Sequence, residues 1–176
     1  MKRFLRVLLV LVLLLVLFRG PVYRLLTDYE ITDYRPVPLP PDERLQTVSD
    51  SLFLLDAEPL GFVRNVQGYV ADRLRFRAHN SGTTAAALHA GGEANCVGYA
   101  RLTADLLNRN RSFTGQDYLA RQGVAKISVL GFDLHRLFDS PFFRDHDVVV
   151  IQNKEGTIVR VVDPSLFDYA GVRWVE

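Results

Sequence analysis

The chain has 176 residues, of which 48% are apolar and one is a cysteine, and its formal net charge is +1. This length predicts one domain with an N-terminal extension. Residues 1–40 carry six Lys or Arg against three Asp or Glu, whereas the remainder carries 15 against 17. The body therefore lacks the basic excess that nucleic-acid binding requires, and a single cysteine excludes an intrachain disulfide or a cysteine-based metal cluster.

Residues 1–26 have the layout of a signal anchor. Three basic residues precede an unbroken run of Val, Leu and Phe over residues 7–18. This run is too uniformly apolar for a soluble amphipathic helix, and residues 4–26 with snorkelling arginines are just long enough to cross a bilayer. No small-residue cleavage pattern follows. We therefore expect an uncleaved, single-pass membrane anchor with the body on the extracytoplasmic side.

Residues 27–42 contain four prolines and two tyrosines and are predicted to form an extended linker between anchor and body. Residues 43–176 are predicted to form one α+β domain, in which helices precede an antiparallel sheet. Helical spacing of apolar residues predicts helices over residues 43–55, 59–74, 84–90 and 96–108. Strand-like patterns follow over residues 124–130, 146–152 and 157–162, and residues 172–175 are a candidate last strand.

The only cysteine, Cys96, lies where a loop turns into a helix. Gly91 and Gly92 interrupt the preceding structure, and Asn95 is a residue type that caps helix N-termini. Cys96 is therefore predicted in the first helical turn, where the helix dipole favours a thiolate nucleophile. A small buried apolar side chain is the alternative interpretation of a lone cysteine, and a nucleophile also requires a base and an orienting carboxylate.

The candidate bases are the four histidines, His79, His89, His135 and His146. If Gln152 pairs with Thr157 across the turn, His146 lies directly opposite Asp163, on the same face of the sheet and with Cβ atoms roughly 5 Å apart. Asp163 would then orient the imidazole and stabilise its protonated form. The alternative is that both residues are solvated strand ends, because a slip of one residue breaks this pairing.

Three other carboxylates compete with Asp163 for this position. Asp145 and Asp147 flank His146, but Asp147 faces the other side of the strand in this register, and Asp168 lies beyond the strand. His89 is expected to cap the short helix before Cys96. The histidine spacings match no metal-binding motif, so we expect no metal ion and no other cofactor.

Three segments occur in an order that is similar to the transglutaminase-like superfamily, which is related to the papain-like cysteine proteases. These are residues 95–102 (NCVGYARL), 145–148 (DHDV) and 162–165 (VDPS). In that superfamily a Cys opens a helix, a His heads one strand and an Asp-Pro closes the next. The resemblance covers about residues 59–169 and implies a papain-like core with a catalytic triad of Cys96, His146 and Asp163. Two positions depart from the family pattern, since Asn95 replaces a common Gly and Val148 a common aromatic.

The resemblance implies acyl transfer at an amide bond of a protein or peptide substrate. The Cys96 thiolate attacks the carbonyl, His146 protonates the leaving amine and Asp163 orients His146. Water or an amine then resolves the thioester, and we favour hydrolysis over cross-linking because water is the default acceptor. The Cys96 backbone N–H is the expected oxyanion donor. Additional candidate donors are Gln67, Tyr69 and His89.

Two other functions remain open at this level. The same fold can serve as a non-catalytic, membrane-tethered binding or assembly module. The missing aromatic at Val148 and the lack of an assigned side-chain oxyanion donor favour this alternative. An unrelated α+β body is the other alternative. It requires the order of Cys, His and Asp to be accidental, and it predicts that Cys96 lies far from His146.

Overall fold

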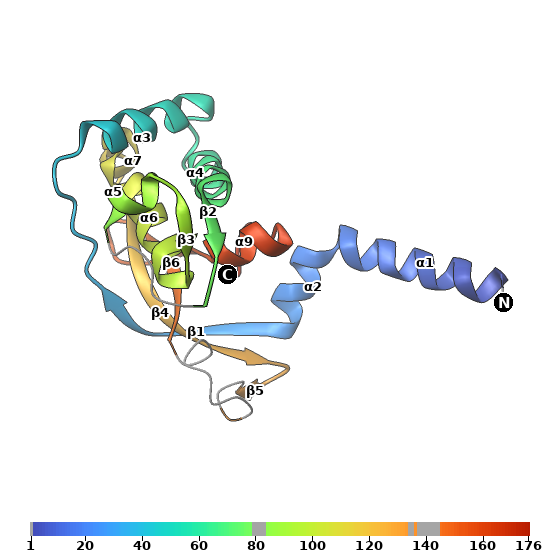
Figure 1. The fold of residues 1–176 in the computed structure, drawn as a ribbon. Coiled ribbons are helices and arrows are strands. Elements are labelled where there is room, and N and C mark those ends of the chain that lie inside the picture. The colour runs from blue at the N-terminus through green and yellow to red at the C-terminus, as the bar shows by residue number, and fades with distance from the viewer. Residues whose placement is uncertain (1, 79–83, 134–135, 137–144) are drawn as a thin grey trace.

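The computed structural model describes residues 2–78, 84–133, 136 and 145–176, and these residues form the mixed α+β fold that the sequence predicts. The helices are α1 (Lys2–Leu17), α2 (Arg19–Leu26), α3 (Glu43–Leu55), α4 (Pro59–Arg73), α5 (Ala85–His89), α6 (Cys96–Arg109), α7 (Arg111–Gly115) and α9 (Pro164–Ala170). The strands are β1 (Thr27–Arg35), β2 (Leu74–Phe76), β3 (Gly92–Ala94), β4 (Leu119–Val129), β5 (Phe132–Asp133), β6 (His146–Gln152) and β7 (Ile158–Val162). Figure 1 shows α1 projecting away from the packed body.

The main sheet is antiparallel, with strand order β1-β4-β6-β7 and the short β5 paired to the end of β4. The strands β2 and β3 form a separate parallel pair, which joins the end of α4 to the loop before α6. All of β6 is buried, because β4 and β7 flank it and α6 packs across it. The sheet therefore carries His146 at the first residue of its most buried strand.

Helix α6 lies at the centre of the body. It packs against β4 and β6, and α3, α4 and α5 pack around it. Tyr99, Leu102 and Leu106 are fully buried, and each such side chain contributes about 1.5–3 kcal/mol relative to an exposed one. The polar residues Asp105 and Arg109 of this helix form a buried ion pair with each other. Cys96 thus begins a helix that is held by packing along its whole length.

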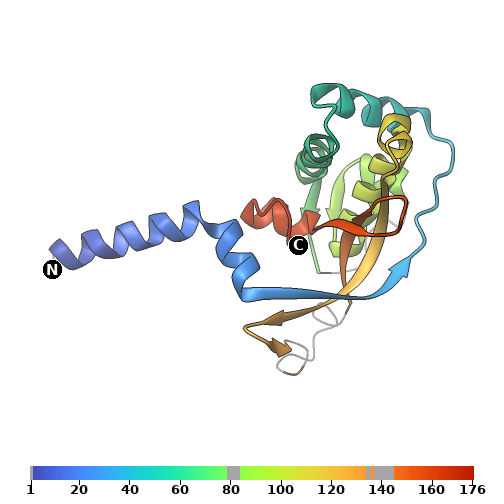
Figure 2. The same ribbon diagram turned by 180° about the vertical axis from the view of Figure 1, so that it is seen from behind.

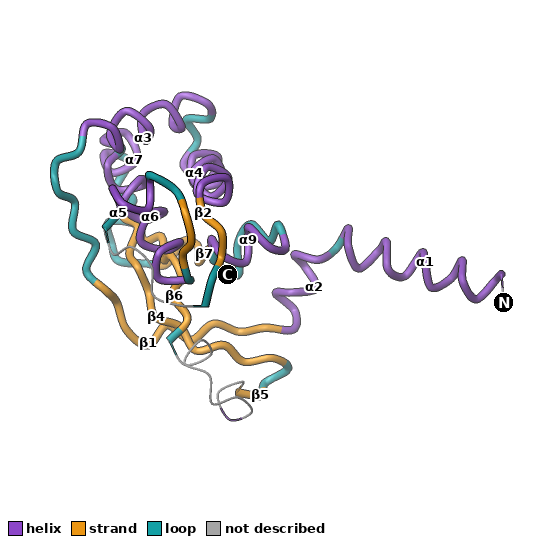
Figure 3. The backbone as a smooth tube through the Cα atoms, in the orientation of Figure 1, coloured by secondary structure: helices purple, strands orange, loops and turns teal. Residues whose placement is uncertain are grey.

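Residues 27–35 do not belong to the predicted linker. They form β1, which pairs with β4 from Thr27 opposite Val129 to Arg35 opposite Gln122, so the linker prediction is wrong for these residues. Within the predicted linker, residues 36–42 lack regular structure, and Figure 3 shows this loop running from β1 to α3 along the outside of the body. The local sequence could not reveal the strand, because its partner lies far away in the chain.

The C-terminal segment also differs in part from the prediction. Residues 171–176 are not assigned to a strand, yet the Val175 backbone N–H donates to the Val161 carbonyl at 2.9 Å. The segment therefore lies along β7 without forming a regular ladder. Strand β4 begins at Leu119, five residues before the predicted start at Val124, and this extension brings Gln122 into the sheet.

The N-terminal helices make a bent extension. Figure 2 shows α1 and α2 meeting at an angle, with α2 leading directly into β1. Apolar side chains of α1 are exposed along its length, including Phe4, Leu5, Leu9, Leu13 and Leu17. Among the helices in the described part of the chain, none is both long enough and apolar enough to span a bilayer.

Candidate active site

Cys96 is the first residue of α6, as the sequence predicts. The Asn95 side chain caps the helix by accepting a hydrogen bond from the Gly98 backbone N–H at 3.3 Å. Gly91 and Gly92 adopt φ values of 93° and 126°, a left-handed region that residues with a Cβ rarely occupy. The thiol is buried, with 5% of the residue exposed, and it lies at the positive end of the helix dipole.

His146 and Asp163 form a buried pair, in which Nε2 of the ring lies 2.6 Å from Oδ2 of the carboxylate. The predicted contact is therefore present, but the predicted register is wrong. Val149 pairs with Val162, so the position opposite Asp163 would be that of Val148 and His146 is displaced by two residues. Because side chains alternate with a period of two, this displacement keeps His146 and Asp163 on the same face of the sheet.

Asp163 is held by four hydrogen bonds and is not a solvated strand end. Its Oδ1 accepts from the Leu166 backbone N–H at 3.0 Å and from the Ser165 hydroxyl at 2.7 Å, because Asp163 is the N-cap of α9. Its Oδ2 accepts from His146 and from the Tyr29 hydroxyl, at 3.2 Å. Burial opposes ionisation, but the charge and hydrogen bond of His146 together with these other donors hold the pKa of Asp163 below its usual range.

His146 is poised to carry a proton. Burial lowers the pKa of its ring, but the charge and hydrogen bond of Asp163 outweigh burial, and hydrogen bonding and charge at Cys96 add to the effect. Together they raise the pKa of His146 to about 10. The imidazole is thus protonated at neutral pH and interacts with both Asp163 and the thiol. The structure brings together all three residues that the sequence selected.

A second hydrogen-bond network joins the first turns of α6 to the strands β1, β4 and β6. Gln122 of β4 donates from Nε2 to Asp147 at 2.6 Å and to the Val97 carbonyl at 3.3 Å, and Arg35 of β1 donates to Asp147 at 2.9 Å. The Gln122 amide oxygen accepts from Arg101 of α6 at 3.0 Å. These bonds connect the first turn of α6 to the sheet beside Cys96.

Arg35 brings positive charge to this region. Partial burial lowers the pKa of Arg35, but the hydrogen bond and charge of Asp147 raise it overall, with further contributions from Asp145 and Cys96. Its side chain is 40% exposed, whereas that of Asp147 is fully buried. Sequence analysis missed Arg35 because it fell in the predicted linker. Asp147 faces away from His146, as predicted, and serves this network instead.

The other predicted residues lie elsewhere. The Tyr69 hydroxyl and His89 Nδ1 are 2.7 Å apart, so these two candidate oxyanion donors bond to each other. Gln67 lines a pocket to which Cys96, His146 and Asp163 do not contribute. Asp168 accepts a hydrogen bond from the Tyr99 hydroxyl at 2.6 Å, and it thereby ties α9 to α6.

Two of the four histidines, His79 and His135, lie outside the described residues. Within the described residues, no group of His, Cys, Asp or Glu side chains is arranged to hold a metal ion.

A pocket of about 430 Å³ opens beside His146 and Asp163. Aromatic and aliphatic side chains line most of it, including Tyr29, Phe76 and Ile127. Phe76 pairs with Ala94 across β2 and β3, two residues before Cys96. The pocket therefore lies between β2, which pairs with the strand before the cysteine, and the end of the main sheet at which His146 and Asp163 meet.

Comparisons with known proteins do not place the chain in a family. No family model, no curated protein and no solved structure matches it.

Proposed function

We propose that this protein is a membrane-anchored, transglutaminase-like cysteine enzyme that acts on amide bonds of proteins or peptides. The observation that carries the proposal is the buried His146–Asp163 pair, whose ring also interacts with a thiol at the N-terminus of α6. A nucleophile, a base and an orienting group in contact are the signature of thiol-dependent acyl transfer. A chance order of Cys, His and Asp would not be expected to bring the three together in a buried cluster.

The reaction starts from a thiolate–imidazolium pair, in which the proton of the Cys96 thiol already resides on His146. The thiolate attacks the carbonyl carbon of the substrate amide and forms a carbon–sulfur bond. His146 then gives its proton to the leaving nitrogen as the carbon–nitrogen bond breaks, and a thioester remains. Asp163 keeps Nε2 of the ring hydrogen-bonded throughout, so the opposite ring nitrogen is directed to the reacting groups.

Water completes the cycle in the hydrolytic reaction that we favour. His146 accepts a proton from the water, the oxygen attacks the thioester carbon, and the carboxylic product leaves as the thiol is restored. The backbone N–H of Cys96 lies in the first turn of α6, where helix N–H groups have no intrahelical acceptor, and it is the proposed oxyanion donor. The adjacent apolar pocket offers room for a substrate side chain.

The proposed membrane attachment rests on α1. The apolar side chains of α1 that the structure describes are exposed, whereas a soluble amphipathic helix buries its apolar face against the body. Lys2, Arg3 and Arg6 lie at the N-terminal end of α1, before its uncharged apolar run, and this order favours an extracytoplasmic body.

Alkylation of Cys96 tests the proposed chemistry. The full chain in neutral detergent is reacted with iodoacetamide near pH 6, and the modified protein is quantified by mass spectrometry. Because the thiolate is the reactive species, we expect the wild type to react at least about tenfold faster than His146→Ala. The control His89→Ala should react like the wild type, since His89 bonds to Tyr69 outside the site.

Equal rates for the wild type and His146→Ala would contradict the enzyme proposal and favour the non-catalytic binding module. The chain has one cysteine, so Cys96→Ser provides a complete blank for the labelling.

A further inference from the structure

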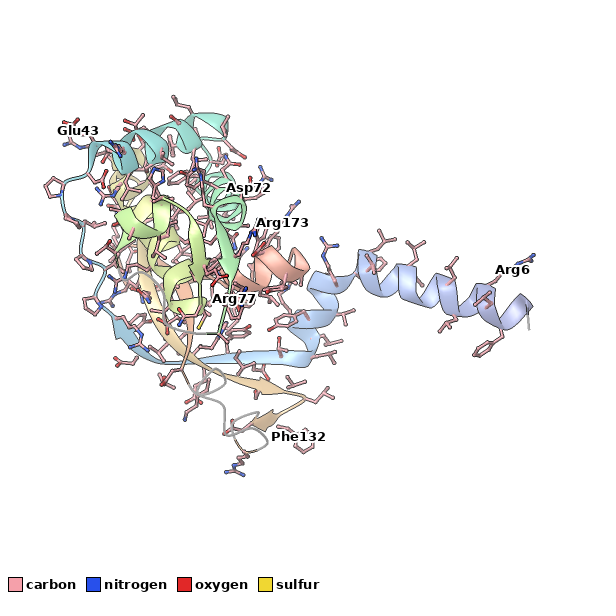
Figure 4. All side chains as sticks on the ribbon, viewed as in Figure 1. Arg6, Glu43, Asp72, Arg77, Phe132 and Arg173 are labelled. Atoms are coloured by element: carbon pink, nitrogen blue, oxygen red, sulfur yellow. The ribbon has the colours of Figure 1, made fainter. Side chains whose placement is uncertain are left out.

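A second pocket lies away from Cys96, His146 and Asp163. It has a volume of about 280 Å³ and lies between α4, β7 and the C-terminal segment. Its polar lining consists of Asp56, Arg64, Gln67, Arg160 and Arg173, together with the indole of Trp174. Figure 4 shows Arg173 beside α4, on the side of the body from which α2 and α1 leave. None of these residues takes part in the proposed reaction.

The pocket carries an excess of positive charge. Arg64 donates to Asp56 at 2.9 Å, so this arginine and the single carboxylate neutralise each other. Arg160 and Arg173 remain, and within the described residues neither forms an ion pair with a carboxylate. Two arginines without a carboxylate partner among the described residues therefore line one pocket, although residues 41–176 have more acidic than basic side chains.

Gln67 adds a neutral polar group to this lining. The residue is 1% exposed, and among the described residues its side-chain nitrogen has no hydrogen-bond partner. A buried amide without a partner is unfavourable, so an unsatisfied group at a pocket wall is expected to have a ligand. An oxygen atom of an anion would satisfy the amide nitrogen and the two arginines together.

Trp174 forms the part of the wall nearest the N-terminal extension. Arg24 of α2 and Arg160 of β7 lie over its ring, at 5.0 Å and 5.8 Å from the centroid. Arg24 also donates to the Trp174 carbonyl at 3.3 Å. The pocket is therefore adjacent to the helix that directly follows the exposed apolar helix α1.

We propose that this pocket binds a phosphate monoester group. Such a group carries about −1.5 to −2 charges at neutral pH, which matches the two uncompensated arginines, whereas a carboxylate would leave one unmatched. Arginine also suits phosphate by geometry, because its planar fork donates two parallel hydrogen bonds. The group can belong to a soluble phosphate compound or to a lipid headgroup at the membrane surface near α1.

The test uses Trp174, which is the only tryptophan of the chain and lies in the pocket wall. The fluorescence of the full chain in neutral detergent is followed during titration with inorganic phosphate, with sodium chloride at equal ionic strength as the control. A parallel titration uses mixed micelles that contain phosphatidic acid, with phosphatidylcholine as the control lipid. We expect a saturable change with phosphate or with phosphatidic acid but with neither control.

The Arg173→Gln variant is expected to weaken this binding at least about tenfold, as the loss of a charge-assisted hydrogen bond predicts. The matched control is Arg44→Gln, an exposed arginine at the other end of α3 from the pocket, which should bind like the wild type. Saturation by inorganic phosphate identifies a soluble ligand, and saturation by phosphatidic acid alone identifies a lipid headgroup. No saturable change with either, or equal binding by the two variants, would overturn the proposal while leaving the Cys96 chemistry untouched.

Discussion

His146 and Asp163 hydrogen-bond at 2.6 Å although they are not opposite each other in the β6–β7 ladder. In the observed register Val148, and not His146, is the position opposite Asp163, and Asp163 is also the N-cap of α9. The bond therefore joins the start of a central strand to the start of a helix. It couples the geometry of the proposed site to the stability of the fold.

This pair predicts a specific pH dependence of stability. A pKa of His146 raised to about 10 in the folded protein, from about 6.5 unfolded, contributes stability that is fully present below about pH 6.5 and is lost as the pH approaches 10. The lowered pKa of Asp163 contributes stability above about pH 3.9, which is lost on further acidification. The stabilisation by the pair is therefore greatest between about pH 4 and pH 6.5.

We expect the difference in free energy of unfolding between the wild type and His146→Ala to be largest in this window and to shrink toward about pH 10. Urea denaturation at a series of pH values measures it. Val162→Ala is the control, because it removes buried apolar contacts beside the pair without removing a titratable group. A difference for His146→Ala that is as flat with pH as that for Val162→Ala would contradict the assigned pair.

Gly98 gives a test of how closely the first turn of α6 is packed. A Cβ at this position would lie 2.9 Å from the Ala94 Cβ and 3.1 Å from a Leu88 methyl group, so Gly98→Ala must displace the turn that carries Cys96. We expect a loss of about 1–3 kcal/mol in the free energy of unfolding, as for other overpacked sites. Iodoacetamide labelling of Cys96 should slow in the same variant.

The matched control is Gly68→Ala in α4, where a Cβ would meet no atom within 4 Å. There the substitution should stabilise the protein by about 0.5–1 kcal/mol, the usual gain of alanine over glycine within a helix. A Gly98→Ala protein that is as stable as Gly68→Ala would show that the turn relaxes freely.

Features that depend on residues close together in the sequence could be predicted, whereas features that depend on pairing between distant segments could not. The helix starts at Pro59 and Cys96 agree with the prediction, because they depend on local signals: a proline in the first turn of α4 and the Asn95 cap of α6. The His146–Asp163 contact was predicted from a wrong register, because an error of two residues preserves the face on which a side chain lies. A one-residue error would have separated them.

The residues that the sequence missed depend on pairing between β1 and β4. Tyr29 and Arg35 lie in a segment whose prolines suggest a linker, and Gln122 lies in a polar segment without a strand pattern. Tyr29 bonds to Asp163 and Arg35 bonds to Asp147, and both partners lie more than 100 positions away in the chain. Gln122 bonds to Asp147 on the neighbouring strand β6. No local pattern signals such contacts.

The Arg35–Asp147 ion pair should support both the fold and the site. Asp147 is fully buried, so Arg35→Met leaves a buried carboxylate without its guanidinium partner. We expect a loss of about 1–3 kcal/mol in the free energy of unfolding, less than for a fully buried pair because Arg35 is partly exposed. Arg121→Met is the control, since Arg121 only lies over the ring of Tyr34, and it should cost less than about 1 kcal/mol.

A double-mutant cycle with Asp147→Asn separates the ion pair from other effects of each substitution. The coupling between Arg35→Met and Asp147→Asn should be at least about 1 kcal/mol, as expected for groups in direct contact. Additive effects would mean that Arg35 acts elsewhere.

Truncation tests where the folded body begins. The described side chains of α1 are exposed, whereas α2 contributes Tyr23 to a hydrogen bond with Tyr29 at 2.6 Å and Arg24 to the contact with Trp174. Deletion of residues 2–17 should therefore change the free energy of unfolding by no more than about 0.5 kcal/mol, as for other changes at exposed positions. Deletion of residues 2–26 should lower it by about 1–3 kcal/mol, because the part-buried Tyr23–Tyr29 hydrogen bond and the Arg24–Trp174 contact are lost.

The same two deletions test the proposed anchor when each is expressed in cells and the membrane and soluble fractions are compared. Since the described apolar side chains of α1 are exposed along the helix, removal of residues 2–17 should already release the protein from the membrane fraction. Retention of this shorter chain on membranes would locate the attachment in the body instead. Equal stability of the two deletions would show that α2 is an appendage, and residues 1–26 would then form one unit separate from the domain.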